Sequence, residues 1–156
     1  MSEAAPTEQA QPTFNIEKLY VKDLSLEVPH APSIFLERAN PQIDLQLHTD
    51  YSAVDEGIYE VTITVTLTAK LAEQDKIMFL IEAQQAGIFH VKNIPALELE
   101  SVLGVVCPNI LYPYIREVVT DVSVRAGFAP VLLNPINFEA LYQQQKAQAA
   151  TTATKH

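Results

Sequence analysis

Cysteine, glycine and basic residues are scarce in this 156-residue chain, and each scarcity excludes a class of protein. With one cysteine, Cys107, the chain cannot form an internal disulfide. Its four glycines supply no glycine-rich loop of the kind that cradles phosphate groups. Ten basic residues stand against 19 acidic ones, and the formal net charge of -9 repels nucleic-acid backbones and anionic lipid surfaces. We therefore expect no nucleic-acid partner.

Long hydrophobic runs are also missing. No apolar run approaches the roughly 20 residues that a membrane-spanning helix needs, and residues 1–13 lack the basic start and apolar core of a signal peptide. With the single cysteine, this predicts a cytoplasmic protein without direct membrane insertion. Residues 1–13 and 146–156 have little to bury and are predicted to be disordered tails around one domain at 14–145.

The side-chain patterns that carry catalysis or bind metal are not found either. There is no Gly-x-Ser-x-Gly or His-Glu-x-x-His motif, and the four histidines are scattered without metal-ligand spacing. Cys107 lies in an apolar stretch without an adjacent base, which favours a packed structural thiol over a nucleophile. We expect no enzyme activity, no metal and no cofactor.

Alternation of apolar and polar residues predicts strands in the first half of the chain. It is clearest in residues 59–68, and shorter alternations cover 23–28 and 43–48. One buried and one wet face favours an antiparallel sheet. A fourth strand at 77–83 is apolar on both faces, which suggests that one face meets a partner. The short connections between the strands fit a meander.

Helical spacing takes over in the second half. An apolar stripe with intervals of three and four residues predicts a helix with Leu111, Ile115, Val118, Val119 and Val122 on one side. Gly127 fits the end of this helix, and Asn137 fits the start of a last helix. Strands followed by helices indicate an α+β fold.

The start of the long helix is marked by residues 106–117, Val-Cys-Pro-Asn-Ile-Leu-Tyr-Pro-Tyr-Ile-Arg-Glu. Pro108 has no backbone amide to donate and fits just before a helix. With Asn109 as the capping residue, Pro113 falls about one turn into the helix. The segment therefore predicts a strand-to-helix corner lined with large side chains.

This stretch, together with residues 22–29 (Lys-Asp-Leu-Ser-Leu-Glu-Val-Pro) and 135–141 (Pro-Ile-Asn-Phe-Glu-Ala-Leu), closely resembles the SecB family of bacterial protein-export chaperones. The resemblance covers residues 14–145. It implies a four-stranded antiparallel sheet with two main helices, assembled as a homotetramer that is a dimer of dimers. It also implies ATP-independent capture of unfolded precursor polypeptides and their delivery to the translocation ATPase SecA.

Four residues are candidates for SecA binding. Asp23 and Glu27 share one face of a strand, about 13 Å apart at about 3.3 Å per residue. Leu80 and Glu82 share one face of another strand. The residues alone favour a solvated sheet face with one tolerated leucine. The resemblance implies instead that these positions form the flat acidic surface that docks SecA.

Five aromatic residues are candidates for a client-binding groove: Phe35, Tyr112, Tyr114, Phe138 and Tyr142. The residues alone place them in or near the core. The resemblance implies that some of them line long grooves for unfolded polypeptide, where rigid rings contact many kinds of apolar side chain. Family members often carry Trp where this chain has Ala39 and Phe where it has Leu26, so its groove differs there. For Phe138, a core position and a groove position both remain open.

Two further alternatives remain open. A small α+β ligand-binding or enzyme domain would have an enclosed pocket with convergent polar groups. A purely structural oligomer would bury its apolar surfaces between subunits. Val118, Val119 and Val122 form a candidate subunit interface, or else they simply cover the sheet.

Overall fold

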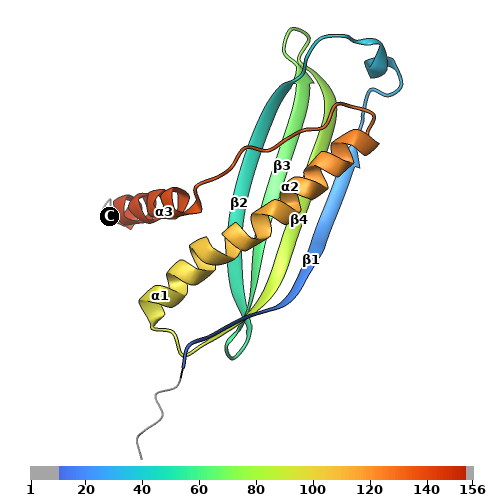
Figure 1. Ribbon diagram of the computed structural model, residues 1–156. Coiled ribbons are helices and arrows are strands. Elements are labelled where there is room, and N and C mark those ends of the chain that lie inside the picture. Colours follow the sequence, from blue (N-terminus) through green and yellow to red (C-terminus); the bar gives the residue numbers. More distant parts are fainter. Residues whose placement is uncertain (1–10, 154–156) are drawn as a thin grey trace, which may run out of the picture.

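In the computed structural model, which describes residues 11–153, a long helix covers one face of a four-stranded antiparallel sheet (Figure 1). The strands are β1 (Thr13–Glu27), β2 (Gln42–Asp55), β3 (Ile58–Leu71) and β4 (Lys76–Lys92). The main helical elements are α1 (Ala96–Ser101), the π-helical turn η2 (Val102–Val106), α2 (Cys107–Arg125) and α3 (Phe138–Ala153). The predicted α+β fold with a four-stranded antiparallel sheet is confirmed.

The alternating residues of β3 define the two faces of the sheet. Val61, Ile63, Val65 and Leu67 are fully buried on the helix side, and the threonines between them are half-buried on the outer face. The strand order is β1-β4-β3-β2, so the two most buried strands lie at the centre. β1 and β2 form the edges.

The predicted meander holds only for β2, β3 and β4. β1 pairs with β4 rather than with β2. The chain therefore crosses the end of the sheet through residues 28–41, which include the short 3-10 helix η1 (Ser33–Leu36). β4 is apolar on both faces and takes a central place between β1 and β3, so burial in the sheet accounts for much of its apolar character.

The predicted strand-to-helix corner is wrong. α1, η2 and α2 form one continuous helix, Ala96–Arg125, and both Pro108 and Pro113 lie within it. The amide of Cys107 bonds to the carbonyl of Val102, five residues earlier. This wider turn accommodates Pro108, which has no amide to donate. Asn109 is exposed, and no side-chain cap closes the start of α2.

α2 lies along β3 and β4 and leaves the two edge strands partly uncovered (Figure 1). Leu111, Ile115 and Val119 of α2 are fully buried. A helix is only about 10–12 Å wide with its side chains, whereas four strands spaced about 4.8 Å apart span about 14 Å from axis to axis, and more with their side chains. One helix therefore cannot cover the whole face of this sheet.

Among the described residues, Ala96–Arg125 is also the one helix that is long and apolar enough to cross a membrane by length and composition. Its apolar stripe instead packs against the sheet. Such burial is typical of the core helix of a globular protein.

An irregular segment, residues 128–137, links α2 to α3 and is called the strap below. Gly127 ends α2 with a φ of +93°, as predicted for a helix C-cap, and the amide of Phe128 bonds back to the carbonyl of Ser123. Asn137 caps α3 as predicted, because its side-chain oxygen accepts a hydrogen bond from the amide of Ala140 at 3.0 Å.

The two tails differ from their predicted bounds. α3 continues to Ala153, so residues 146–153 are helical where the sequence predicted a disordered tail. At the other end, Thr13 already belongs to β1. Most of the predicted N-terminal tail lies outside the described residues.

Candidate functional site

The outer face of the sheet, turned away from α2, brings together the four residues predicted to bind SecA. Glu27 stands opposite Leu80 and Ser25 stands opposite Glu82, with Asp23 two residues further along β1. Directly opposed residues in antiparallel strands point to the same face. The three acidic side chains therefore share the outer face with the half-buried Leu80: Glu27 lies directly beside it, and Glu82 and Asp23 lie further along the strands.

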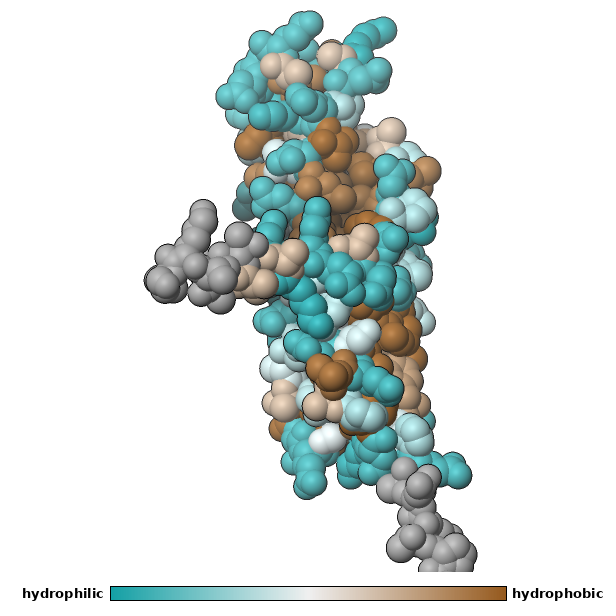
Figure 2. All heavy atoms as spheres, turned by 90° about the vertical axis from the view of Figure 1, so that its left-hand side faces the viewer, coloured by the Kyte–Doolittle hydropathy of each residue, from teal (hydrophilic) through white to brown (hydrophobic). Residues whose placement is uncertain are grey.

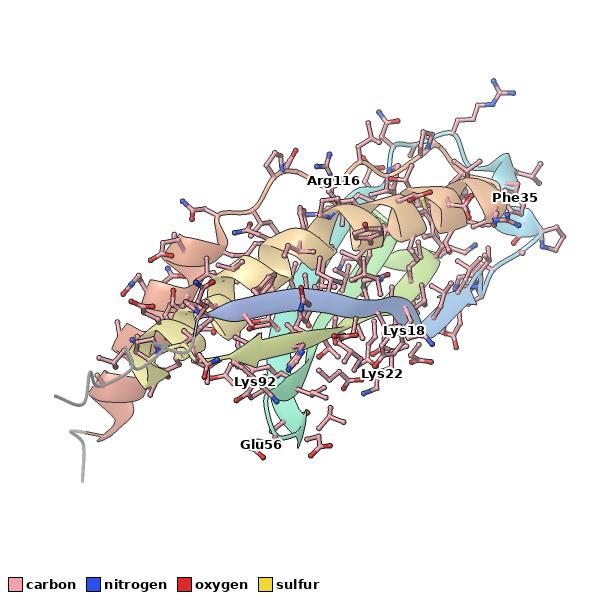
Figure 3. All side chains as sticks on the ribbon, turned by 60° about the horizontal axis from the view of Figure 1, so that its bottom comes forward. Lys18, Lys22, Phe35, Glu56, Lys92 and Arg116 are labelled. Carbon is pink, nitrogen blue, oxygen red and sulfur yellow. The ribbon has the colours of Figure 1, made fainter. Side chains whose placement is uncertain are left out.

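A hydrogen-bonded cluster lies on the same face, towards the other end of the sheet. The Tyr20 hydroxyl on β1 donates across β4 to the Glu60 carboxylate on β3, and the Lys22 ammonium donates to that carboxylate at 2.7 Å. These two hydrogen bonds, first that from Lys22, hold the pKa of Glu60 below its ordinary value. Burial, followed by the bond to Glu60, raises the pKa of Tyr20 to about 12. Figure 3 shows Lys18 and Lys22 on the side of the sheet away from Arg116 of α2.

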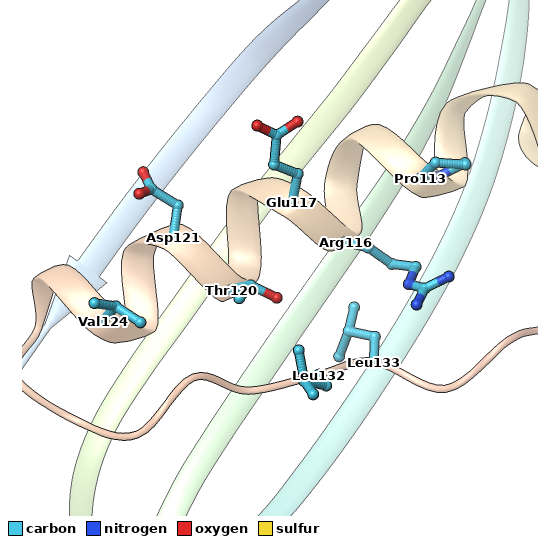
Figure 4. Close-up of a pocket in the computed structure, with 8 residues that line it drawn as sticks. All are labelled: Pro113, Arg116, Glu117, Thr120, Asp121, Val124, Leu132 and Leu133. Atoms are coloured by element: carbon cyan, nitrogen blue, oxygen red, sulfur yellow. The ribbon is translucent and has the colours of Figure 1, made fainter.

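On the helix side, two grooves lie along the strap, one on each side of it. The first has a volume of about 540 Å³ and lies between α2 and the strap; its walls are mainly apolar and also carry Arg116, Glu117 and Asp121 (Figure 4). The second has a volume of about 490 Å³ and includes Ile43 and Leu45 of β2. Leu132 and Leu133 of the strap line both grooves. Figure 2 shows hydrophobic side chains gathered in a hollow on the upper part of the face that carries the β2 edge.

A third groove, of about 350 Å³, lies on the β1 side of α2. Leu19 and Val21 of β1 face Tyr114 and Val118 of α2 across it. The helix-side apolar row of β1 is 37–46% exposed and consists of Phe14, Ile16, Val21, Leu24 and Leu26. Both edges of the sheet therefore present apolar surface beside α2.

Comparison with known proteins identifies the family. The family model described as "Preprotein translocase subunit SecB" matches residues 7–149. A protein-export protein SecB from Nitrosomonas eutropha is 60% identical over 144 residues, which cover 92% of this chain and 90% of that protein. One from Chromobacterium violaceum is 62% identical over 143 residues, covering 92% and 94%. This chain belongs to the SecB family.

A solved structure shares the SecB fold. It is a SecB-like chaperone from Mycobacterium tuberculosis in complex with a peptide from an antitoxin. The likeness has a TM-score of 0.64 at 20% sequence identity, and it covers 79% of this chain and 90% of that one. At this identity the likeness shows a common fold.

The structure of this SecB family member divides the five aromatic groove candidates. Phe35 and Tyr114 are 49% and 44% exposed. Tyr112 and Phe138 are buried with their ring centroids 5.5 Å apart. This burial corrects the groove position predicted for Tyr112 and, for Phe138, agrees with the core position of the two that the sequence left open. Tyr142 is half-buried where α3 rests on η2.

Phe35 is the outer member of a stack of aromatic rings. It stacks on Phe128 of the strap at 5.2 Å, and Phe128 stacks on the buried Phe79 of β4 at 4.7 Å. A Cβ at Gly127 would come within 3.0 Å of the Phe35 ring, so the glycine is needed for this approach as well as for its positive φ. The stack joins η1, the strap and the core.

The predicted interface on the α2 valines is also corrected. Val119 and Val122 are 0% and 6% exposed and belong to the core beneath α2, so they cover the sheet rather than meet another subunit. Val118 is half-buried and lines the β1-side groove. A helical stripe gives the direction of the buried face, but it does not say whether the covering surface belongs to the same chain.

The chemistry of the surface suits binding. Within residues 11–153, no group of three or more histidine, cysteine, aspartate or glutamate side chains is arranged to hold a metal ion. Burial raises the pKa of the Cys107 thiol to about 12, so the thiol stays protonated at neutral pH. The described grooves are open at the surface and mainly apolar.

Several groove residues were not predicted from the sequence. Ile43 and Leu45 were recognised as strand residues but not as exposed ones, and Leu132 and Leu133 were not singled out. A signal for the strap leucines was present, because they lie between Pro130 and Pro135, where no regular element can bury them.

Proposed function

We propose that this SecB family member captures unfolded precursor polypeptides without ATP, holds them in the cytoplasm and delivers them to SecA for export. The observation that carries the proposal is the uncovered apolar face of β2, which borders an open groove beside the strap; a second open groove lies between the strap and α2. Contiguous exposed apolar surface on a folded protein marks a binding site. An unfolded polypeptide offers apolar side chains in the extended form that such grooves can accept.

Tight binding of an unfolded client would arise from several weak contacts along its chain. Once one segment of a client is bound, each later contact is intramolecular, so modest affinities combine into tight binding. The bound client is then removed from the pool that folds or aggregates. Phe35, half-exposed on its stack, and Tyr114 offer rigid rings to side chains of different shapes.

The test is binding of a permanently unfolded polypeptide, followed by titration calorimetry with and without ATP. We expect complex formation in both conditions, with the negative heat-capacity change of apolar burial. The control is the natively folding parent of that polypeptide, which should not bind. A requirement for nucleotide, or equal binding of this folded control, would contradict the proposal.

Delivery to SecA is proposed to use the outer face of the sheet. Asp23→Lys and Glu82→Lys should each weaken SecA binding and leave client capture unchanged, because exposed carboxylates steer association and contribute little to packing. The effect should shrink with added salt, since exposed charges are screened over about 10 Å at 0.1 M. Asp50→Lys is the matched control, because Asp50 is an exposed carboxylate on β2 outside this acidic group. If Asp23→Lys and Glu82→Lys both bound SecA as the parent does, the acidic face would not be the docking site.

A homotetramer, as a dimer of dimers, is proposed to use the β1 edge. One side of the β1 backbone has no neighbouring strand in the described chain, and its apolar row is exposed beside it. Two antiparallel copies of β1 related by a two-fold axis would pair these backbones and cover both rows. Light scattering should give a mass near four times 17.3 kDa. A stable monomer at micromolar concentration would overturn this assembly.

A further inference from the structure

The two grooves on the β2 side are separated by a single segment of chain, the strap. Leu132 and Leu133 line both the groove of about 540 Å³ beside α2 and the groove of about 490 Å³ beside β2. Figure 4 shows the strap running along α2, with both leucines on the α2 side of β2. If the middle of the strap moved away from α2, the two grooves would become one wider trough.

The strap is pinned at its ends and loosely packed between them. At one end Phe128 stacks on Phe79 at 4.7 Å, and just after the other end Phe138 packs against Tyr112 at 5.5 Å. Of the described residues 129–137, Leu133 is buried in the core, Val131 and Ile136 are half-buried against it, and the others are exposed. The aromatic anchors fix where the strap begins and ends, and Leu133 is the one core residue of the stretch between them.

Three side chains of α2 hold the middle of the strap. The Thr120 hydroxyl donates to the Val131 carbonyl at 2.7 Å, and the Val131 amide donates to the Ser123 hydroxyl oxygen at 3.0 Å. The Tyr112 hydroxyl donates to the Asn134 carbonyl. In the described chain, residues 129–136 make no hydrogen bond between backbone groups. Segments with few buried contacts and few backbone bonds open at low free energy.

Pro130 and Pro135 reduce the number of hydrogen-bond donors in the strap. Neither has an amide, so neither can donate to a ladder with β2 or to a helical turn. The strap lies beside the edge strand β2 without pairing to it. Strand pairing would fix the strap in place, and the two missing donors weaken any such pairing.

We propose that the strap is a displaceable divider, whose middle lifts from α2 and joins the two grooves for client segments with large apolar side chains. This inference rests on the proposed capture of unfolded polypeptides. It adds that the size of a client segment determines whether the segment binds the closed or the open form of the strap. Small segments bind in either groove with the strap closed. Bulky segments bind the open form, so the low population of that form reduces their apparent affinity.

Thr120→Val tests the divider, because it removes the bond to the Val131 carbonyl and keeps the shape of the side chain. One such bond favours the closed form by roughly 2- to 12-fold, so the open population should rise by about that factor. Hydrogen exchange at the Val131 amide, whose acceptor Ser123 remains, should speed up by the same factor. The β3 amides should keep their rates. Affinity for an unfolded peptide rich in Phe and Leu should rise in proportion, and affinity for its Ala-substituted version should not change.

Thr68→Val is the matched control, since it makes the same change on the outer face and should alter neither exchange at Val131 nor peptide affinity. Tyr112→Phe removes the bond to the Asn134 carbonyl. Like Thr120→Val, it should speed up exchange at the Val131 amide and raise affinity for the bulky peptide, and it replaces Thr120→Val in the test if Thr120→Val folds poorly. An unchanged or reduced affinity for the bulky peptide, or an equal rise for both peptides, would overturn the divider. If the parent protein captured neither peptide, the proposed function itself would fail.

Discussion

Leu67 of β3 and Leu45 of β2 stand directly opposite each other on the helix side of the sheet, yet Leu67 is fully buried and Leu45 is 37% exposed. Both leucines belong to alternating apolar and polar stretches of the sequence. The difference comes from α2, which packs mainly on β4 and β3 and leaves this part of β2 uncovered. An apolar residue at the centre of this sheet therefore packs in the core, and an apolar residue at the edge remains exposed and can contact a binding partner.

The largest expected loss of stability is at a residue in the buried core. Phe138 is 2% exposed and packs on Tyr112, so Phe138→Ala should lower the free energy of unfolding by about 3–5 kcal/mol, the usual loss for an emptied aromatic core site. Denaturant unfolding measures it, and Tyr114→Ala, at an exposed ring, is the control that should cost far less. A small loss of stability together with weaker client binding would place Phe138 in a groove after all.

The opposed leucines give a sharper version of the same test. Leu67→Ala should destabilise the protein by about 2–5 kcal/mol. Leu45→Ala should cost less, about 1–2 kcal/mol, because Leu45 is already 37% exposed to water. Under the proposed function, Leu45→Ala should weaken binding of an unfolded client at a temperature where both variants are folded, and Leu67→Ala should not. Equal losses of stability would remove the distinction between centre and edge.

The sequence predicted those parts of the fold that depend on local chemistry. The alternation at residues 59–68 located β3 and its two faces, and Gly127 and Asn137 marked the helix ends where the structure has them. Alternation also placed Asp23 with Glu27 on one face of their strand and Leu80 with Glu82 on one face of theirs, and the pairing of β1 with β4 makes these the same face of the sheet. Each of these predictions depends on side-chain direction or backbone preference within a few residues.

The wrong predictions have a common cause. Whether a residue is covered by another element depends on parts of the chain that are distant in the sequence. The stripe that holds Val119 showed a buried face correctly, but not that this chain's own sheet covers it. Pro108 was placed before a helix because a proline removes a hydrogen bond, and the π-turn that accommodates it depends on the preceding turn. The exposure of Leu45 depends on the width of a helix more than 60 residues later in the chain.

The smallest expected effect concerns the connection between an edge strand and the centre. Glu60 on the central strand β3 accepts hydrogen bonds from Tyr20 and Lys22 of the edge strand β1. Glu60→Gln should cost about 1 kcal/mol of stability at pH 7, since the pair is partly exposed and screened by water. Thermal unfolding of parent and variant at a series of pH values measures the difference.

The sign of the pH dependence follows from the direction of the shift. The pKa of Glu60 is lowered in the folded protein, first by the hydrogen bond from Lys22, so its contribution is fully present above the ordinary value of 4.5 and is lost as the pH falls through the folded pKa. The stability gap between parent and Glu60→Gln should therefore be constant near neutrality and close in acid. On the alkaline side, Tyr20 has its pKa raised from 10.0 to about 12, so the contribution of its neutral hydroxyl should be lost only as the pH rises through that range. Tyr20→Phe should remove this alkaline loss. A gap that stayed open in acid would mean that Glu60 acts through packing, and the connection between edge and centre would then not be electrostatic.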